Sequence, residues 1–108
     1  MREGRVEVWN EANGNWGTVC QSGFDENAAN VVCNMLGYNS SAYFGTMFGP
    51  GTGAILLDEL QCTGEEQSLF DCPHSGVGNA RCSHTEDVGV ICGCRLLLPL
   101  IPQKLISI

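Results

Sequence analysis

The first part of the chain alternates apolar and polar side chains. Over positions 5–9, Val6 and Val8 alternate with Arg5, Glu7 and Trp9. Such a period of two is typical of a half-buried β-strand. Asn13-Gly14 follows as a favourable tight turn, and residues 16–20 continue as a second apolar stretch. This pattern predicts a β-hairpin.

After Asp25, the spacing of the apolar residues changes to that of an α-helix. The Asp25 side chain can accept a hydrogen bond from the first turn of a helix, and Gly37 is of the residue type that commonly ends helices. Between these two positions, apolar residues recur at helical spacing, at Ala28, Ala29, Val32, Cys33 and Leu36. The spacing predicts one amphipathic helix.

The rest of the chain combines loops with short apolar runs. Residues 45–53 contain four glycines and Pro50, which predicts a loop. The run Ile55-Leu56-Leu57 predicts a buried strand, residues 68–70 a helical turn, and residues 88–92 a closing strand. Together these elements predict an α+β fold: a small disulfide-stapled domain in which a curved antiparallel sheet cradles one helix and carries long loops.

The cysteine content indicates where the protein folds. The chain has 108 residues, which suits a single domain. It contains seven cysteines and no C-x-x-C pair, so a disulfide framework formed in an oxidising compartment is favoured over a cytosolic metal site. We therefore expect an extracellular protein. Six cysteines allow fifteen pairings, and spacing alone does not choose among them.

The charge and the hydropathy of the chain argue against binding of nucleic acid and against insertion into a membrane. The net charge of −7 and the isoelectric point near 4.5 disfavour nucleic acid, because binding to phosphate requires many Lys and Arg side chains. The apolar run at residues 96–102 contains two prolines and is far shorter than the roughly 20 residues that span a bilayer. We expect no binding of nucleic acid and no membrane insertion by this segment.

Several multi-residue motifs follow one another along the chain, and six of the seven cysteines lie within them. They are Gly4-Arg5-Val6-Glu7-Val8, Trp16-Gly17-Thr18-Val19-Cys20, Val31-Val32-Cys33-Asn34-Met35-Leu36-Gly37-Tyr38, Ile55-Leu56-Leu57-Asp58-Glu59-Leu60-Gln61-Cys62, Cys72-Pro73-His74, Cys82-Ser83-His84 and Glu86-Asp87-Val88-Gly89-Val90-Ile91-Cys92. In this order and at these spacings they resemble the scavenger receptor cysteine-rich (SRCR) domain. The resemblance covers residues 4–93. Residues 1–3 are then an N-terminal remnant, and residues 94–108 are an unmatched apolar tail that we expect to be disordered.

The resemblance implies a disulfide pairing. The family has a six-cysteine and an eight-cysteine form, and Glu3 and Tyr38 stand where the eight-cysteine form has its extra bridge. The chain therefore resembles the six-cysteine form. The disulfides implied are Cys20 with Cys82, Cys33 with Cys92, and Cys62 with Cys72.

Cys94 is left without a partner in this pairing. One interpretation is an intermolecular disulfide that links two copies of the chain. The other, which we favour, is a free thiol in a disordered tail.

Zinc binding and nucleophilic catalysis are weaker interpretations. Ser83, His84 and Asp87 lie close in sequence, but the chain has no Gly-x-Ser-x-Gly motif to present a nucleophile. Zinc ligands usually come in pairs about two to four residues apart, which does not match the interval of ten that separates Cys62, Cys72, Cys82 and Cys92. We expect neither a zinc site nor enzymatic activity.

Calcium is the metal that suits an acidic chain, because it prefers carboxylate and carbonyl oxygens. The resemblance implies two neighbouring calcium sites, and this chain departs from both. At the first, Gln21-Ser22 replaces an acid pair, which leaves only Glu86. At the second, Asp58 and Glu59 remain, but Arg81 replaces an asparagine.

These departures lead to a specific hypothesis. We expect the guanidinium of Arg81 to form an ion pair with Asp58 and Glu59 and so to take the place of one calcium ion. No cofactor is then required. Two alternatives stay open: a calcium site formed by Asp58, Glu59 and Glu86, and a solvated acidic face without a specific ion.

Two further features concern the surface. Asn39-Ser40-Ser41 is an N-glycosylation sequon that follows the predicted helix, where a loop is expected. Phe44, Met47 and Phe48 lie in or beside the glycine-rich loop. These three side chains either fold under the loop, which we favour, or are presented to a ligand.

The resemblance also implies a function. SRCR domains are non-catalytic extracellular modules that recognise protein or microbial surface ligands, within larger receptors or secreted proteins. A protein partner is favoured here because the chain lacks a basic cluster. The alternatives are an accessory interaction or targeting domain of an extracellular protease or oxidase, and a stand-alone secreted effector.

Overall fold

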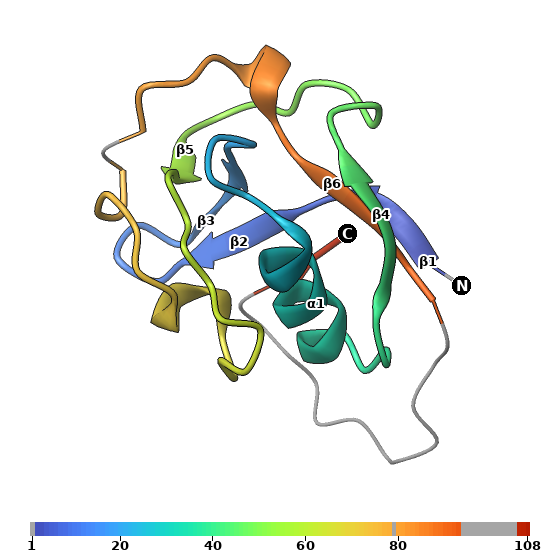
Figure 1. Ribbon diagram of the computed structural model, residues 1–108. Coiled ribbons are helices and arrows are strands. Elements are labelled where there is room, and N and C mark those ends of the chain that lie inside the picture. Colours follow the sequence, from blue (N-terminus) through green and yellow to red (C-terminus); the bar gives the residue numbers. More distant parts are fainter. Residues whose placement is uncertain (1, 79, 94–105) are drawn as a thin grey trace.

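The computed structural model describes residues 2–78, 80–93 and 106–108 (Figure 1). Within these ranges the chain forms one α-helix, two short 3-10 helices and seven strands. The helices are α1 (Glu26–Met35), η1 (Leu69–Asp71) and η2 (His84–Glu86). The strands are β1 (Arg2–Arg5), β2 (Glu7–Asn10), β3 (Asn15–Val19), β4 (Ser41–Gly45), β5 (Ile55–Leu57), β6 (Gly89–Cys92) and β7 (Ile106–Ser107).

The strands form two small sheets that share one core with α1. The first has the order β1-β6-β4, with both pairs antiparallel. The second has the order β5-β3-β2-β7, in which β3 and β5 run parallel and the other pairs are antiparallel. The predicted α+β fold with one helix is confirmed. The expected antiparallel sheet is divided in two, and it includes one parallel pair.

The division occurs at Val6, where the strand expected at residues 5–9 splits into β1 and β2. Val6 is fully buried, and its backbone N–H donates to the carbonyl of Val88 (3.0 Å). The N–H of Val88 in turn donates to the carbonyl of Val19 (2.9 Å). These bonds let the chain pass from one sheet to the other without leaving the buried Val6 and Val88 amides unpaired.

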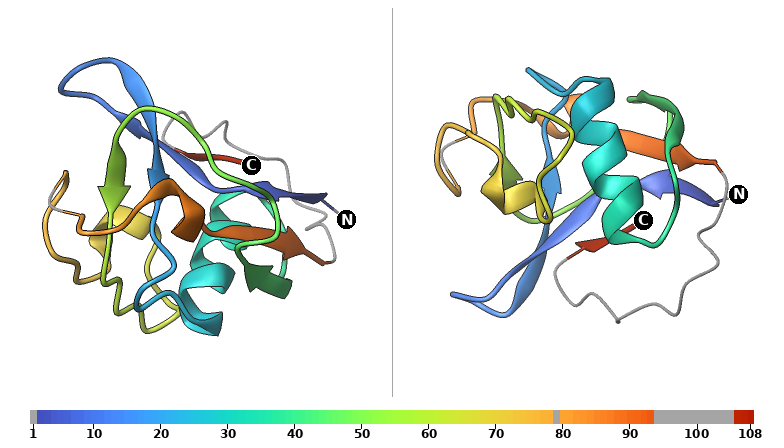
Figure 2. Two further views of the ribbon diagram at one scale, coloured as in Figure 1. Left: turned by 90° about the horizontal axis from the view of Figure 1, so that it is seen from above. Right: turned by 60° about the horizontal axis from the view of Figure 1, so that its bottom comes forward.

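The predicted hairpin consists of β2 and β3. Trp9 lies opposite Trp16 in the antiparallel register, and their rings meet edge to face with centroids 5.3 Å apart. Gly14 in the turn has a φ of 70°, which glycine adopts without a steric penalty. The hairpin projects from the body of the domain (Figure 2).

Helix α1 has the predicted ends. The Asp25 carboxylate accepts a hydrogen bond from the N–H of Ala28 (3.0 Å), and Gly37 follows the helix with a φ of 86°. The buried face of α1 packs against β4 and β6, and it consists of Ala28, Ala29, Val31, Val32, Cys33 and Met35. The helix has ten residues. No helix in the described part of the chain is long and apolar enough to cross a bilayer.

Three disulfides join the same cysteine pairs that the family resemblance implies. Cys33–Cys92 links α1 to β6, and Cys20–Cys82 links the end of β3 to the segment before η2. Their partners are 59 and 62 residues apart in sequence. Chain-entropy estimates give about 4 kcal/mol for each of these long loops and about 3 kcal/mol for Cys62–Cys72, whose partners are 10 residues apart.

The end of the chain does not match the expected disordered tail. Ile106 and Ser107 form β7, which pairs with β2, and Ile106 is buried in the core. That expectation is therefore wrong for residues 106–108. Residues 94–105 lie outside the described residues, and so does Cys94. Both interpretations of its thiol stay predictions.

Candidate functional site

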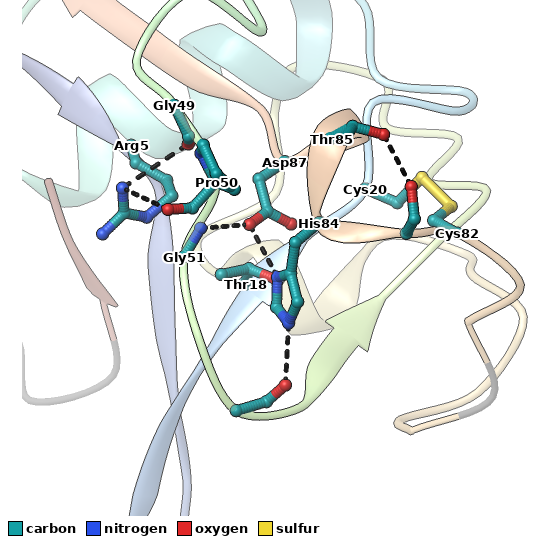
Figure 3. Close-up of polar contacts among 12 residues, drawn as sticks. Arg5, Thr18, Cys20, Gly49, Pro50, Gly51, Cys82, His84, Thr85 and Asp87 are labelled. Atoms are coloured by element: carbon teal, nitrogen blue, oxygen red, sulfur yellow. Dashed lines mark hydrogen bonds and ion pairs between the residues drawn. A yellow bond between two sulfur atoms is a disulfide. The ribbon is translucent and has the colours of Figure 1, made fainter.

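The glycine-rich loop at residues 46–53 is attached to the domain by polar contacts (Figure 3). Arg5 Nη1 lies 3.5 Å from the carbonyl oxygens of both Gly49 and Pro50, while the same guanidinium forms an ion pair with Glu7 (2.9 Å). Farther along the loop, the N–H of Gly51 donates to the buried carboxylate of Asp87 (2.7 Å). The loop is thus fixed at several backbone positions.

His84 makes the last attachment. Its Nδ1 lies 2.8 Å from Asp87 Oδ2, and its Nε2 lies 2.9 Å from the carbonyl oxygen of Gly53 (Figure 3). Both partners accept hydrogen bonds, so the two contacts are satisfied together only when both ring nitrogens carry protons. The hydrogen bond to Asp87 is the main cause that raises the pKa of His84, and the Gly53 carbonyl adds to it. With Asp87 ionised, these two contacts favour the protonated, imidazolium form of His84.

Asp87 is the centre of this set of contacts. The residue is 1% exposed, and Oδ2 accepts from both Gly51 and His84, whereas Oδ1 has no hydrogen-bond partner. A buried carboxylate is costly unless a positive charge and hydrogen-bond donors compensate it. His84 supplies that charge. We refer to Gly51, Gly53, His84 and Asp87 as the His84–Asp87 cluster.

The cluster does not have the arrangement of a nucleophilic site. Catalysis by serine requires its hydroxyl to bond a histidine nitrogen. Here the Ser83 hydroxyl contacts the hydroxyl of Thr85 (2.6 Å), and both nitrogens of His84 are directed elsewhere. Proximity in sequence has therefore not produced a Ser-His-Asp triad.

The three apolar residues of the loop region behave differently from one another. Phe44 packs on Phe24, with ring centroids 5.8 Å apart, and is half-buried. Phe48 is also half-buried, against Gly89, where its ring leaves no room for a side chain. Met47 is 65% exposed, more than any other exposed large hydrophobic side chain in the described residues. The expectation that all three fold under the loop is wrong for Met47.

Asp58, directly after β5, is the second buried carboxylate. It is 4% exposed, and among the described residues its carboxylate accepts from backbone donors alone: Oδ1 from the N–H of Glu59 (2.8 Å) and Oδ2 from the N–H of Arg81 (3.2 Å). Its own carbonyl accepts from the N–H and hydroxyl of Ser75. Together with Ala80, these residues line a hollow of about 550 Å³.

The ion pair expected from Arg81 is absent. The fold does bring Arg81 to Asp58 and Glu59, but the contact is made by the Arg81 backbone amide, and the guanidinium forms no ion pair with either carboxylate. Two backbone N–H groups already occupy the oxygens of Asp58, so this carboxylate has hydrogen-bond donors without the guanidinium. Glu59 has a positive φ of 56°. Besides its bond to Asp58, its N–H donates to the backbone carbonyl of Ser22 (3.0 Å).

The three carboxylates named for calcium do not meet at one point. Glu86 is exposed, and its carboxylate lies 3.8 Å from the disulfide sulfur of Cys20. Among the described residues, the groups of three candidate ligands within 4.8 Å are Cys20 with Cys82 and Glu86, and Cys62 with Cys72 and Glu66. In both groups two of the ligands are sulfurs already bonded to each other. No such group contains Asp58 or Glu59.

Asn39 is exposed in the turn between α1 and β4. The serine of its sequon, Ser41, donates from its N–H and its hydroxyl to the side-chain amide oxygen Oδ1 of Asn30 (2.8 and 3.0 Å). Glycosylation at Asn39 stays a prediction.

Sequence reasoning missed most of the His84–Asp87 cluster. Gly51 and Gly53 take part through backbone groups, which have no residue-specific signal. The structure does explain the glycine at position 51, because the side chains of Arg5 and Thr18 leave no space there for a Cβ atom.

The fold and the site define a small disulfide-stapled α+β domain that displays loops fixed by polar contacts. The family model of the scavenger receptor cysteine-rich domain matches residues 1–93, and the chain belongs to this family. A scavenger receptor cysteine-rich domain superfamily protein of Patiria pectinifera is 48% identical over 105 residues, covering 95% of this chain and 9% of that protein. Mouse lysyl oxidase homolog 2 is 49% identical over 92 residues, covering 83% of this chain and 12% of that protein.

Two solved structures have the same fold. The dimeric form of the SRCR domain of mouse MARCO superposes with a TM-score of 0.78 and 42% identity, covering 85% of this chain and 87% of that chain. The third SRCR domain of murine neurotrypsin gives a TM-score of 0.71 and 44% identity, covering 83% of this chain and 84% of that one. The chain thus covers more than four fifths of each of these two domains but about a tenth of the length of the curated relatives.

Proposed function

We propose that this chain is a non-catalytic, extracellular ligand-binding module of a larger receptor or secreted protein. The observation that carries the proposal is Met47, 65% exposed on a loop that Arg5 and the His84–Asp87 cluster attach to the domain. A loop whose backbone is already fixed loses little further backbone entropy when its exposed apolar side chain contacts a ligand. Family membership and the oxidising framework of three disulfides support the extracellular setting.

The ligand that suits this surface is a protein rather than a polyanion. The net charge is −7, and Arg5, one of the few basic residues of the domain, is paired with Glu7. A microbial surface ligand recognised through apolar or cationic groups also fits. Nucleic acid does not, because the chain has only five Lys and Arg residues to neutralise phosphates.

We also propose that recognition requires no calcium. Both carboxylate oxygens of Asp58 already accept backbone N–H groups, and Glu86 is not gathered with Asp58 and Glu59. A calorimetric titration of the oxidised domain with CaCl₂ checks this, and little heat and an unchanged melting temperature are expected. Saturable binding that Asp58→Asn abolishes would contradict the proposal and support the calcium alternative.

A second candidate is favoured by a specific similarity. The identity of 49% to lysyl oxidase homolog 2 fits an accessory interaction or targeting domain of an extracellular oxidase or protease. Flanking sequence with a catalytic domain would establish it. A stand-alone secreted effector is the remaining alternative, and a disulfide-linked dimer through Cys94 in a native mass spectrum would support it.

The test of the main proposal compares two single variants. The labelled, oxidised domain is titrated onto arrays of purified extracellular proteins and onto whole bacteria, and bound ligand is measured for wild type, Met47→Gln and Gln67→Ala. Gln67 is an exposed control outside the loop. We expect Met47→Gln to weaken binding about tenfold and Gln67→Ala to leave it unchanged. Equal binding by Met47→Gln and wild type would show that the loop is not the ligand surface.

A further inference from the structure

A second surface lies at the hairpin. The end of the β2–β3 hairpin and the segment from η1 to Val77 enclose a groove of about 570 Å³. Its apolar lining includes Trp9, Ala12, Phe70 and Val77. Val77 is 48% exposed, although it is a large hydrophobic residue. The hairpin itself projects from the body of the domain (Figure 2).

Both walls of the groove are held in place before any ligand arrives. On the hairpin, Trp9 packs edge to face on Trp16, which is itself 39% exposed. On the other wall, Phe70 belongs to η1, where the Ser68 hydroxyl accepts its N–H (3.2 Å), inside the loop closed by Cys62–Cys72. Rigid aromatic surface of this kind binds at a low cost in conformational entropy.

The groove also has a charge that the protein does not neutralise. Glu11 and Asp71 are among its lining residues and are exposed. Among the described residues, neither carboxylate forms an ion pair or a side-chain hydrogen bond. No Lys or Arg of the described ranges lines the groove. The unpaired charges are therefore complementary to a cationic partner.

We infer that this groove binds a peptide segment of a partner protein that carries a large apolar side chain flanked by Lys or Arg. The apolar side chain contacts Trp9, Phe70 and Val77, and the basic residues pair with Glu11 and Asp71. The inference rests on the proposed role as a ligand-binding module, but it concerns a surface separate from the loop at Met47. Recognition combines burial of aromatic area with charge pairing at the rim.

The test uses short synthetic peptides and the two tryptophans as probes. Three Gly/Ser peptides have the centres Lys-Leu-Lys, Glu-Leu-Glu and Ser-Leu-Ser, and each is titrated into the ¹⁵N-labelled oxidised domain. We expect the Lys-Leu-Lys peptide to shift the indole N–H signals of Trp9 and Trp16, which Trp16→Phe assigns. Binding should weaken as salt is added, because exposed charge pairs are screened.

Variants separate this groove from the loop and from non-specific attraction. The double variant Glu11→Gln with Asp71→Asn should weaken binding of the Lys-Leu-Lys peptide about tenfold, at about threefold for each exposed charge pair. Val77→Ser should also weaken binding. Glu65→Gln, which removes an exposed carboxylate elsewhere, and Met47→Gln should leave the affinity unchanged.

Several results would overturn the inference. Equal affinity for the Lys-Leu-Lys and Glu-Leu-Glu peptides would remove the role of charge. If millimolar peptide shifts neither indole N–H signal, the groove is not the site. The same follows if Glu65→Gln and the double variant lose equal affinity for the peptide. If Met47→Gln loses its array ligands while the peptide still binds, the two surfaces are independent. If the Lys-Leu-Lys peptide does not bind while binding of the array ligands still depends on Met47, only the groove proposal is overturned.

Discussion

Asp87 and Asp58 are both buried carboxylates, yet the protein compensates their charges in different ways. Asp87 faces His84, whose pKa it raises, and Oδ1 of Asp87 has no hydrogen-bond partner. Within the described part of the chain, Asp58 accepts from backbone amides alone, and both of its oxygens accept hydrogen bonds. The first arrangement depends on a titratable partner and the second does not. The loop that carries Met47 is therefore attached through the pH-sensitive arrangement, which is the one at Asp87.

The largest expected effect is the loss of Asp87. Asp87→Ala removes the acceptor of the Gly51 N–H and leaves the His84 charge without its counterion. We expect the free energy of unfolding to fall by about 3 kcal/mol, measured by urea denaturation under oxidising conditions. Glu86→Ala, at an exposed neighbouring carboxylate, is the control and should change stability by less than about 0.5 kcal/mol. Equal losses would mean that the cluster is not held by Asp87.

The next effect concerns Asp58. Asp58→Asn keeps one acceptor oxygen but turns an amino group toward one of the two N–H donors. We expect a loss of about 1 kcal/mol for Asp58→Asn and about 2 kcal/mol for Asp58→Ala, by the same measurement. A loss at Asp58→Asn as large as that at Asp87→Ala would contradict the view that Asp58 needs no counterion.

A pH profile separates the two carboxylates directly. The pKa of His84 is raised in the folded protein above its ordinary value of 6.5, so its protonation stabilises the fold. That contribution is fully present below about pH 6.5 and is lost as the pH rises through the raised pKa. The difference in melting temperature between wild type and His84→Gln should therefore shrink with rising pH. A difference in melting temperature that grows with pH would mean that protonation of His84 does not stabilise the fold. Asp58→Asn should show no such trend over the same range.

The smallest effect is expected at Arg81. Only its backbone amide contacts Asp58, so Arg81→Ala keeps the contact. We expect a change in unfolding free energy below about 0.5 kcal/mol, as for other exposed side chains. A loss near that of Asp58→Ala would revive the ion pair inferred from the sequence. Arg81→Pro, which removes the amide donor, is the matched comparison and should cost more.

Local patterns in the sequence predicted the local structure well. The alternation around Val6 and Val8 predicted the hairpin, and Asp25 and Gly37 predicted both ends of α1. These predictions succeed because strand and helix periods and capping preferences depend on residues a few positions apart. The pairing of six cysteines came from the family resemblance rather than from spacing.

What the tertiary structure alone decided is which groups meet across long separations. The split at Val6 depends on Val88, and β7 pairs with β2 from the far end of the chain. The partners of His84 and Asp87 in the loop are a carbonyl and an amide at Gly53 and Gly51.

Backbone groups occur at every residue, so no sequence motif could mark those two partners. The same reason explains the error at Arg81, where the residue type predicted a guanidinium contact and the fold used its amide. The sequence by itself determined the family, the hairpin, the helix and the charge of the protein. The packing of distant segments decided which of its charges are compensated and which are left for a partner.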